Sequence, residues 1–370
     1  MTKTAQPAKG NGDSGNIVLS IDAMGGDKGP AMVMSGLHKA LQRNARLRFL
    51  VHGDSAVLEP LAAKHRLLRE RCEIRHAADV VTMDSKPSHV MRHGKGTSMW
   101  AAVDAVRDGE ARACVSCGNT GALMALSMIR LRKLPGVNRP AIACLWPSRN
   151  PAGFNVMLDV GADIRAEAED LVQYALMGAF YAQIALELEK PRIGLLNVGT
   201  EEHKGRAELK VAHDMLLEAA QSGLFEYVGY VEGGDIPSAR TDVIVTDGFT
   251  GNIALKTGEG TARLVSDLLK QAFRHSILSR LASLLALTSL LRLRRRIDPR
   301  RVNGGVFLGL NGTVVKSHGS SDATGIEAAV RLAHELARAD LPGQLAHRVA
   351  SVEEARQGAA QVGQLYGNQK

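Results

Sequence analysis

Residues 316–322 hold the side chains of this chain with the greatest capacity for chemistry. Lys316 offers a point charge for a phosphate, and His318 can exchange a proton near neutral pH. Ser320 and its neighbouring serines add hydroxyl donors. The segment follows an apolar run and precedes a helical pattern that begins at Ala323. It is interpreted as an anion-binding turn, with a charged helix-capping segment as the alternative.

Glycine-rich turns follow apolar runs at three further places, residues 22–27, 116–121 and 247–252. A turn of this kind between a strand and a helix presents free backbone N–H groups and the positive end of the helix dipole, so it can hold an anion. In an open parallel sheet, such turns meet outside the carboxyl ends of the strands. We therefore expect one cleft that is built from several strand ends.

Apolar strands alternate with amphipathic helices from Ile17 onward, which predicts a doubly wound, mostly parallel sheet in a three-layer α/β sandwich. One catalytic unit is expected over residues 17–350, with two subdomains that share the cleft. Helices are expected at residues 31–42, 55–68 and 98–106, and a longer one at 166–188. Residues 79–96 are polar and basic, and are either a loop over the cleft or a solvated connection.

The composition is that of a globular protein, with 45% hydrophobic and 23% charged residues among 370. The formal net charge of +8 favours an acidic partner, which could be nucleic acid, an anionic membrane or an acidic protein. Nucleic acid is disfavoured because only 4% of the residues are aromatic and could stack on bases.

The four cysteines, Cys72, Cys114, Cys117 and Cys144, lie in or beside apolar stretches, as reduced buried thiols do. The lone CxxC pair is interpreted as strand packing, and no metal or cofactor is expected. Residues 1–16 are polar and lack the apolar core of a signal peptide or a membrane span. We predict a disordered tail there and a flexible tail at 351–370.

A basic, leucine-rich arm is predicted over residues 261–297, where apolar residues recur at helical spacing and no acid occurs between Asp267 and Asp298. Its most apolar part is too short to cross a bilayer, which takes about 20 residues. It could lie on an anionic membrane surface or pack as a helical hairpin against a dimer partner, and the two are compatible. The residues expected to make these contacts are Leu281, Leu284, Leu285, Leu287, Leu290 and Leu291.

Taken together, several segments resemble the signature segments of the acyl-ACP:phosphate acyltransferase (PlsX) family. They occur in order between about residues 17 and 349, at 22–27, 118–121, 158–161, 197–205, 229–235, 247–252 and 316–321. Asp163 departs from the pattern, which has Asn there, and the N-terminal tail and the arginine run near 292–296 are longer than in the family.

The resemblance implies transfer of a long acyl chain from acyl carrier protein to inorganic phosphate, which gives acyl phosphate for phospholipid synthesis. It also implies a fold similar to phosphotransacetylases and isocitrate dehydrogenases, and a cytoplasmic homodimer at the inner face of the membrane. The next acyltransferase of the pathway is a possible further partner. Acyl carrier protein is acidic, so the net positive charge of this chain would favour its binding.

Direct attack of phosphate on the thioester is favoured over a covalent intermediate, since phosphate is already anionic and a thiolate leaves readily. We expect His318 as proton donor or electrostatic partner and Asp247 as its orienting residue. Asn119 and Asn252 are expected as orienting or oxyanion donors. The residues expected to bind phosphate or thioester are Lys316, Gly118, Asn119, Thr120, Gly121, Ser320, Asp22, Gly25 and Gly26.

Other functions fit the sequence less well. A nicotinamide dehydrogenase is disfavoured because Gly25, Gly26 and Gly29 do not form a G-x-G-x-x-G fingerprint. A metal-dependent decarboxylase would use carboxylates such as Asp242, Asp247 and Asp322. A phosphate acetyl- or butyryltransferase that uses acyl-CoA, and a non-catalytic scaffold for acyl carrier protein, remain alternatives.

Overall fold

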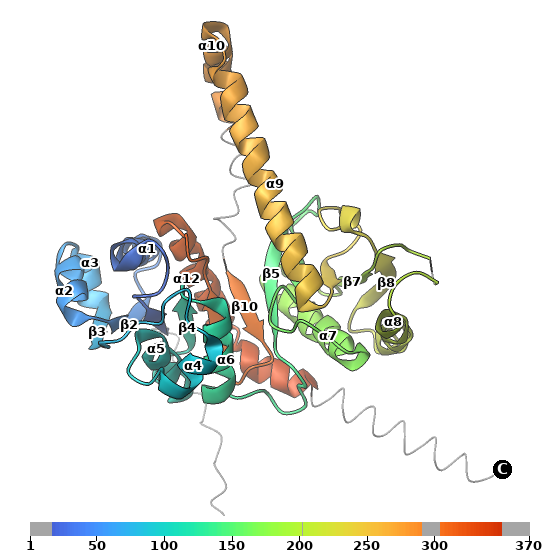
Figure 1. The fold of residues 1–370 in the computed structure, drawn as a ribbon, viewed down its shortest axis with the longest axis horizontal. Helices are drawn as coiled ribbons and strands as arrows, with labels where there is room; N and C mark the ends of the chain where they lie inside the picture. Colours follow the sequence, from blue (N-terminus) through green and yellow to red (C-terminus); the bar gives the residue numbers. More distant parts are fainter. Residues whose placement is uncertain (1–16, 202, 291–303, 350–370) are drawn as a thin grey trace, which may run out of the picture.

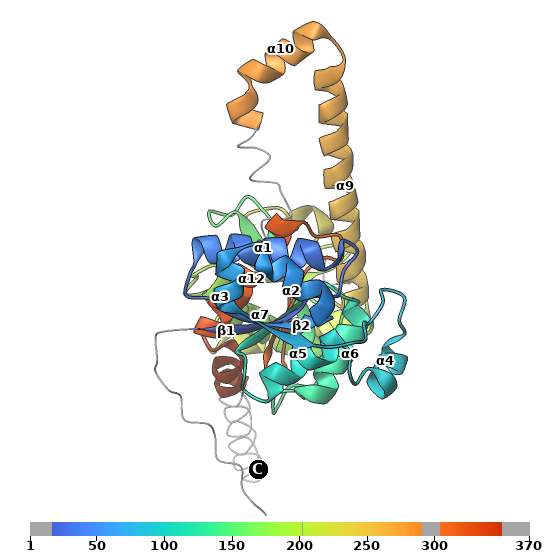
Figure 2. The same cartoon turned by 90° about the vertical axis from the view of Figure 1, so that its left-hand side faces the viewer.

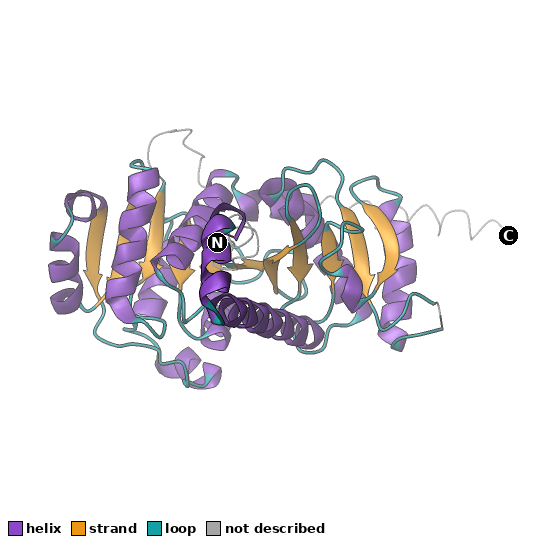
Figure 3. Ribbon diagram, turned by 90° about the horizontal axis from the view of Figure 1, so that it is seen from above, coloured by secondary structure: helices purple, strands orange, loops and turns teal. Residues whose placement is uncertain are grey.

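The computed structural model describes residues 17–201, 203–290 and 304–349, and a single twisted sheet runs through these residues (Figure 3). Its eleven strands have the order β3-β2-β1-β4-β11-β10-β5-β6-β9-β7-β8. The strands are β1 (Val18–Asp22), β2 (Arg48–Gly53), β3 (Cys72–His76), β4 (Ala113–Ser116), β5 (Ala141–Pro147), β6 (Phe154–Leu158), β7 (Arg192–Leu196), β8 (Glu226–Val231), β9 (Val243–Val245), β10 (Gly305–Leu308) and β11 (Thr313–Lys316).

The predicted α/β class with a mostly parallel sheet is confirmed. The antiparallel pairings join β10 to β11, β10 to β5 and β5 to β6, while β1, β2, β3, β4 and β11 run parallel to one another, as do β6, β7, β8 and β9. β10 and β5 therefore join two parallel half-sheets at the middle of the molecule.

Helices cover both faces of the sheet (Figures 2 and 3). They are α1 (Gly29–Arg43), α2 (Ser55–Ala63), α3 (Arg66–Arg71), α4 (Pro87–His93), α5 (Ser98–Arg107), α6 (Thr120–Arg130), α7 (Ala168–Ala185), α8 (Ala207–Ala220), α9 (Gly248–Arg274), α10 (Ile277–Leu285) and α12 (Ala323–Arg338), with a 3-10 turn at Gly233–Asp235. One apolar cluster joins α1, α7, α8 and α12 to the sheet, and a second joins α5 and α6 to it.

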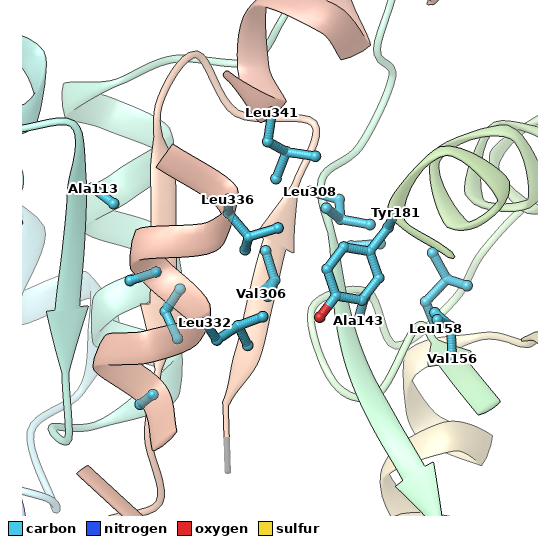
Figure 4. Close-up of a cluster of buried hydrophobic side chains, with 14 of the residues drawn as sticks. Ala113, Ala143, Val156, Leu158, Tyr181, Val306, Leu308, Leu332, Leu336 and Leu341 are labelled. Atoms are coloured by element: carbon cyan, nitrogen blue, oxygen red, sulfur yellow. The ribbon is translucent and has the colours of Figure 1, made fainter. Parts of the chain in front are cut away.

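Apolar packing is continuous across the junction of the two half-sheets (Figure 4). Leu332 and Leu336 of α12 are buried beside Val306 of β10, and Tyr181 of α7 is buried close to Ala143 of β5. Fully buried side chains of this size each contribute about 1.5–3 kcal/mol relative to exposure. This packing joins the two half-sheets through one continuous core.

Most predicted elements are present, with two differences. The helix expected at 55–68 is broken into α2 and α3, because His65 takes an extended conformation between them. The polar segment 79–96 contains a short helix, α4, which begins at Pro87. Thr97 caps α5, since its Oγ1 accepts a hydrogen bond from the Trp100 amide.

The predicted helical arm is also present and projects from the body (Figures 1 and 2). It is formed by α9, which is continuous from the cleft outward, and by α10, which turns away from it at Ser276. Ser276 caps α10, since its Oγ accepts from the Ser279 amide at 3.0 Å. Leu281, Leu284 and Leu285 are 53%, 65% and 89% exposed, so the apolar face of the arm is uncovered in one chain.

Among the described helices, none has the length and apolar character that a membrane crossing requires. Leu287 and Leu290 lie just beyond α10 and are described, whereas Leu291 and the arginine run lie outside the described residues. The tails predicted at 1–16 and 351–370 also lie outside them. The four cysteines are free thiols, as predicted.

Candidate active site

Three of the four predicted turns meet at the carboxyl ends of β1, β4 and β11. The register of these parallel neighbours aligns Asp22 with Ser116 and Ser116 with Lys316. The amide of Asp27 donates to the Gly319 carbonyl at 2.8 Å, so the first and last turns touch. The sheet topology therefore assembles the expected cleft from segments nearly 300 residues apart in sequence.

Asp22 is buried beneath this cleft and links neighbouring segments through hydrogen bonds. Its carboxylate accepts hydrogen bonds from Ser98 Oγ at 2.7 Å and Ser116 Oγ at 2.6 Å, and the Gly118 amide donates to Ser116 Oγ at 3.0 Å. A Cβ at Gly25 would lie 2.7 Å from Asp22 Oδ2 and from the Gly118 nitrogen, so glycine is required there. Asp22 and the Gly118 amide therefore hold the turns together, and their expected role in binding phosphate or thioester stays a prediction.

Lys316 lies at the centre of the three turns and is 9% exposed. Its Nζ donates to the carbonyl oxygens of Cys117, at 3.4 Å, and Ser317. Burial lowers the pKa of Lys316 to about 8, against the opposing effect of Asp22 and Asp27. The ammonium is thus held in a poorly hydrated place, where an anionic ligand would interact with it strongly.

The N-terminus of α6 opens beside Lys316 and presents the first-turn residues Thr120 and Gly121. Asn119 caps this helix through its Oδ1, which accepts from the Ala122 amide at 2.9 Å. Its Nδ2 donates to the carbonyls of Met83 and Ser85. Both ends of the Asn119 side chain thus fix the loop and the helix, and its expected role as an orienting or oxyanion donor stays a prediction.

An apolar cavity of about 330 Å³ lies next to Lys316 and the N-terminus of α6. Its polar end includes Thr120, Lys316 and His318. One wall is the face of β5 that carries Ile142, Cys144 and Trp146, and the opposite wall is α9, with Leu255, Gly258 and Ala262. A Cβ at Gly258 would lie 2.4 Å from the Trp146 ring, so α9 can pack this closely only through glycine.

His318 is 46% exposed and pairs with Glu259 of α9, whose Oε1 lies 3.2 Å from His318 Nε2. The pKa of His318 lies below its ordinary value because burial, together with Lys256, Lys316 and Arg263, outweighs the favourable charge of Glu259. The expected pairing of Asp247 with His318 is wrong. Residue type alone did not single out Glu259, which lies about three turns into α9.

Asp247 instead caps α9 and anchors a neighbouring loop. It accepts from the Thr250 amide at 2.8 Å and the Thr250 hydroxyl at 2.9 Å, and it pairs with Arg206. The turn that follows packs against residues 159–163, where the Gly248 amide donates to the Asp163 carbonyl at 2.7 Å. Asp247 is thus a structural residue of the cleft wall.

Asn252 lines the cavity, and its Nδ2 donates to the Val160 carbonyl at 3.0 Å. That bond ties the amide to the neighbouring strand end and leaves the expected orienting or oxyanion role of Asn252 a prediction.

Ser320 is exposed in the 316–321 turn, and Gly26 adopts a φ of 95° against Cys117. Asp163, which departs from the family pattern, pairs with Arg139 at 2.8 Å.

Fold and site together define a class of protein: a doubly wound α/β protein in which a buried lysine and a helix N-terminus lie beside an apolar cavity. In the structural comparison, the chain is similar to a phosphotransacetylase from Streptococcus pyogenes, with a TM-score of 0.57, 17% identity, and 87% of this chain and 94% of the other covered. It is also similar to a branched-chain phosphotransacylase from Enterococcus faecalis V583, with a TM-score of 0.54, 16% identity and coverage of 87% and 99%. At identities this low, the structural likeness shows the fold alone.

The sequence comparisons establish the family. The family model described as "Fatty acid synthesis protein" matches residues 17–344. Curated relatives named "Phosphate acyltransferase" include one from Jannaschia sp. (strain CCS1), 70% identical over 94% of this chain and 95% of the relative. Another, from Paracoccus denitrificans (strain Pd 1222), is 64% identical over 100% of this chain and 98% of the relative. The chain belongs to this phosphate acyltransferase family and is an acyltransferase, which confirms the resemblance.

Proposed function

We propose that this enzyme transfers a long-chain acyl group from acyl carrier protein to inorganic phosphate and releases acyl phosphate for phospholipid synthesis. The observation that carries the proposal is the junction of an anion site and an apolar cavity at Lys316. The names of the relatives support phosphate as the acceptor. The apolar walls of β5 and α9 suit a fatty acyl chain.

In the proposed mechanism, phosphate binds between the Lys316 ammonium and the free amides of Thr120 and Gly121 at the start of α6. The helix terminus and the charge act together on an anion in a site of low polarity. Phosphate is held there against the thioester carbonyl, so the attack becomes effectively intramolecular. His318 lies at the same end of the cavity and moves the proton.

The cysteines at the cleft do not favour a covalent acyl-enzyme. Burial raises the pKa of Cys144 to about 12, and burial also raises the pKa of Cys117 despite the opposing effects of Ser317 and Lys316. Both thiols are therefore protonated at pH 7 and are poor nucleophiles. This supports the proposed direct attack by phosphate in a ternary complex.

We accordingly predict that Cys144→Ala and Cys117→Ser keep turnover within about threefold of the parent, since no thiolate takes part. The measurement is steady-state thiol release, together with mass spectrometry of the protein after mixing with acyl carrier substrate. Accumulation of an acylated cysteine, or loss of turnover by more than about 100-fold in a folded variant, would contradict direct transfer.

The basic helix α4 lies at the rim of the site and is the surface that we propose for the acidic carrier. A Cβ at Gly121 would lie 3.1 Å from Pro87, the first residue of α4. Lys86, Arg92 and Lys95 are exposed on or beside this helix. A carrier bound there would bring its thioester to the N-terminus of α6.

Charge reversal on α4 should therefore weaken carrier binding selectively. For Lys86→Glu combined with Arg92→Glu, we expect KM for acyl carrier protein to rise about tenfold and its salt dependence to decrease, while KM for phosphate stays unchanged. The matched control is Arg69→Glu on α3, which is exposed but does not border the cavity. Equal effects of both variants would exclude α4 as the docking surface.

The exposed apolar face of α10 supports a peripheral membrane contact, a dimer contact, or both. Leu284→Glu with Leu285→Glu should lower binding to anionic vesicles at least about tenfold, because each leucine loses its apolar burial there. Val211→Glu with Leu217→Glu, on exposed positions of α8, is the control. Unchanged vesicle binding with a loss of dimer in analytical ultracentrifugation would assign the face to the dimer instead.

The experiment that tests the proposed function compares acyl donors of the same chain length. We expect phosphate-dependent release of the carrier thiol from palmitoyl carrier protein, at a rate well above that from palmitoyl coenzyme A. Faster reaction of a short acyl coenzyme A would support an acetyl- or butyryltransferase. Absence of thiol release from every donor would leave a non-catalytic scaffold.

A further inference from the structure

The floor of the apolar cavity is formed by three neighbouring strands, with a glycine on the middle one. The strand register pairs Gly305 of β10 with Lys316 of β11, and it places Gly305 beside Cys144 of β5. All three residues line the cavity. Neighbouring strands lie about 4.8 Å apart, so the Cα atom of Cys144 is about 10 Å from that of Lys316. An acyl chain that starts at the Lys316 end can therefore cross the floor over Gly305, which has no side chain.

One end of the cavity is closed beside Ile142 of β5. Asn252 of α9 donates from its Nδ2 to the Val160 carbonyl at 3.0 Å, which joins the helix to the loop that follows β6. Ile142 and Val160 are both buried. An acyl chain that has crossed Gly305 is thereby directed the other way, toward the carboxyl end of β5.

Trp146 lies in that direction and crosses the cavity. It shares a face of β5 with Cys144, and about 7 Å of strand separates their Cα atoms. A Cβ at Gly258 of α9 would lie 2.4 Å from Cη2 and 2.6 Å from Cζ2 of the indole, so the ring reaches from β5 to the backbone of the helix. Pro147, next on the strand, and Ala262, one turn further along α9, also line the cavity. The ring therefore divides the cavity into an inner and an outer part.

We propose that Trp146 is a specificity-determining residue that limits the length of the acyl chain. It has this role only if the cavity holds the acyl group of the donor, so the inference rests on the proposed function. Chains that end before the indole fit in the inner part. Longer chains must displace the ring from Gly258 to reach the outer part, and they lose the contact between ring and helix.

Competition between myristoyl and stearoyl carrier protein measures this selectivity. In Trp146→Ala, we expect the ratio of kcat/KM for the stearoyl donor to that for the myristoyl donor to rise at least about tenfold, because the two parts of the cavity become continuous. Cys144→Leu adds volume to the floor before the ring and should lower the same ratio about tenfold. The control is Gly260→Ala, where a Cβ would meet no atom within 4 Å, and the ratio should stay that of the parent.

Fluorescence locates the acyl chain without any turnover. The chain has two tryptophans, Trp100 and Trp146, and Trp100 packs instead beside Gly94 at the end of α4. Trp146 is therefore the single indole in Trp100→Phe. The probe is palmitate that carries bromine, a contact quencher, either at its terminal carbon or next to its carboxyl group. We expect strong quenching of Trp146 by terminal bromine, weak quenching by the other label, and neither effect on Trp100 in Trp146→Phe.

Two results would overturn the inference. One is a stearoyl-to-myristoyl ratio that is unchanged in folded Trp146→Ala, and the other is equal quenching of Trp146 by the two bromopalmitates. If terminal bromine quenches Trp146 selectively while the parent releases no thiol from any donor, the position of the acyl chain stands and the proposed transfer fails. If the ratio shifts as expected only with acyl coenzyme A donors, the role of Trp146 stands and the carrier is excluded as the donor.

Discussion

Replacing Lys316 by methionine is expected to reduce kcat/KM for phosphate by about 10²–10³-fold, because the site loses the charge that meets the anion in a poorly hydrated place. Methionine keeps the apolar stem that is buried between the turns, so the fold should be retained. The measurement is thiol release over a range of phosphate concentrations. We expect the loss in kcat/KM for phosphate, while KM for the acyl carrier substrate changes little.

The pH dependence of the same parameter gives a second check on Lys316. Burial lowers its pKa to about 8, so the ammonium is present below that value and is lost as the pH rises through it. In the parent, kcat/KM for phosphate should therefore decline above pH 8, since this parameter reports groups of the free enzyme. Lys316→Arg keeps its charge, so a folded arginine variant should lack that decline.

Equal phosphate kinetics in the parent and in Lys316→Met would remove Lys316 from the anion site. A decline above pH 8 that persists unchanged in both variants would assign the titration to another group. Ionisation of phosphate itself is common to all three proteins, so the comparison cancels it.

Replacing Gly251 by alanine is expected to destabilise the protein by about 3 kcal/mol or more, since a new methyl group cannot fit where α9 meets the 159–163 loop. A Cβ at Gly251 would lie 1.9 Å from the Asp159 carbonyl oxygen and 3.0 Å from Thr246 Cγ2. Asp159 is held by the amides of Ile142, Gly161, Ala162 and Asp163, so that loop has little freedom to move away.

Gly260 on the same helix provides the matched control. It is exposed in the interior of α9, and a Cβ there would meet no atom within 4 Å. Gly260→Ala should therefore stabilise the protein by up to about 1 kcal/mol through helix propensity. Chemical denaturation measures both changes. Equal shifts in the two variants would show that close packing at Gly251 does not explain the 247–252 turn.

The sheet class and most elements could be predicted because they depend on local patterns. Apolar runs mark β1, β2, β4, β7 and β9, and helical spacing marks α1, α7 and the arm. The break at His65 and the antiparallel strands β10 and β5 could not be predicted in the same way. Pairing direction depends on which strands become neighbours, and that is decided by packing across the whole chain.

The site was predictable at the level of its turns, and less so at the level of individual atoms. Residue type placed Lys316, His318 and the start of α6 in one cleft, since strand ends of a parallel sheet meet there. It did not show that the side chains of Asp22, Asn119 and Asp247 form hydrogen bonds within the protein. Glu259 was missed because a single acid on a long amphipathic helix looks like any solvated residue.

The most direct test of the central claim is a single-turnover experiment with excess enzyme and palmitoyl carrier protein, mixed rapidly with or without phosphate. Direct transfer at the Lys316 site predicts that free carrier thiol and acyl phosphate appear together, at the same rate, and only when phosphate is present. A burst of thiol without phosphate, with the acyl group retained on the protein, would contradict the account.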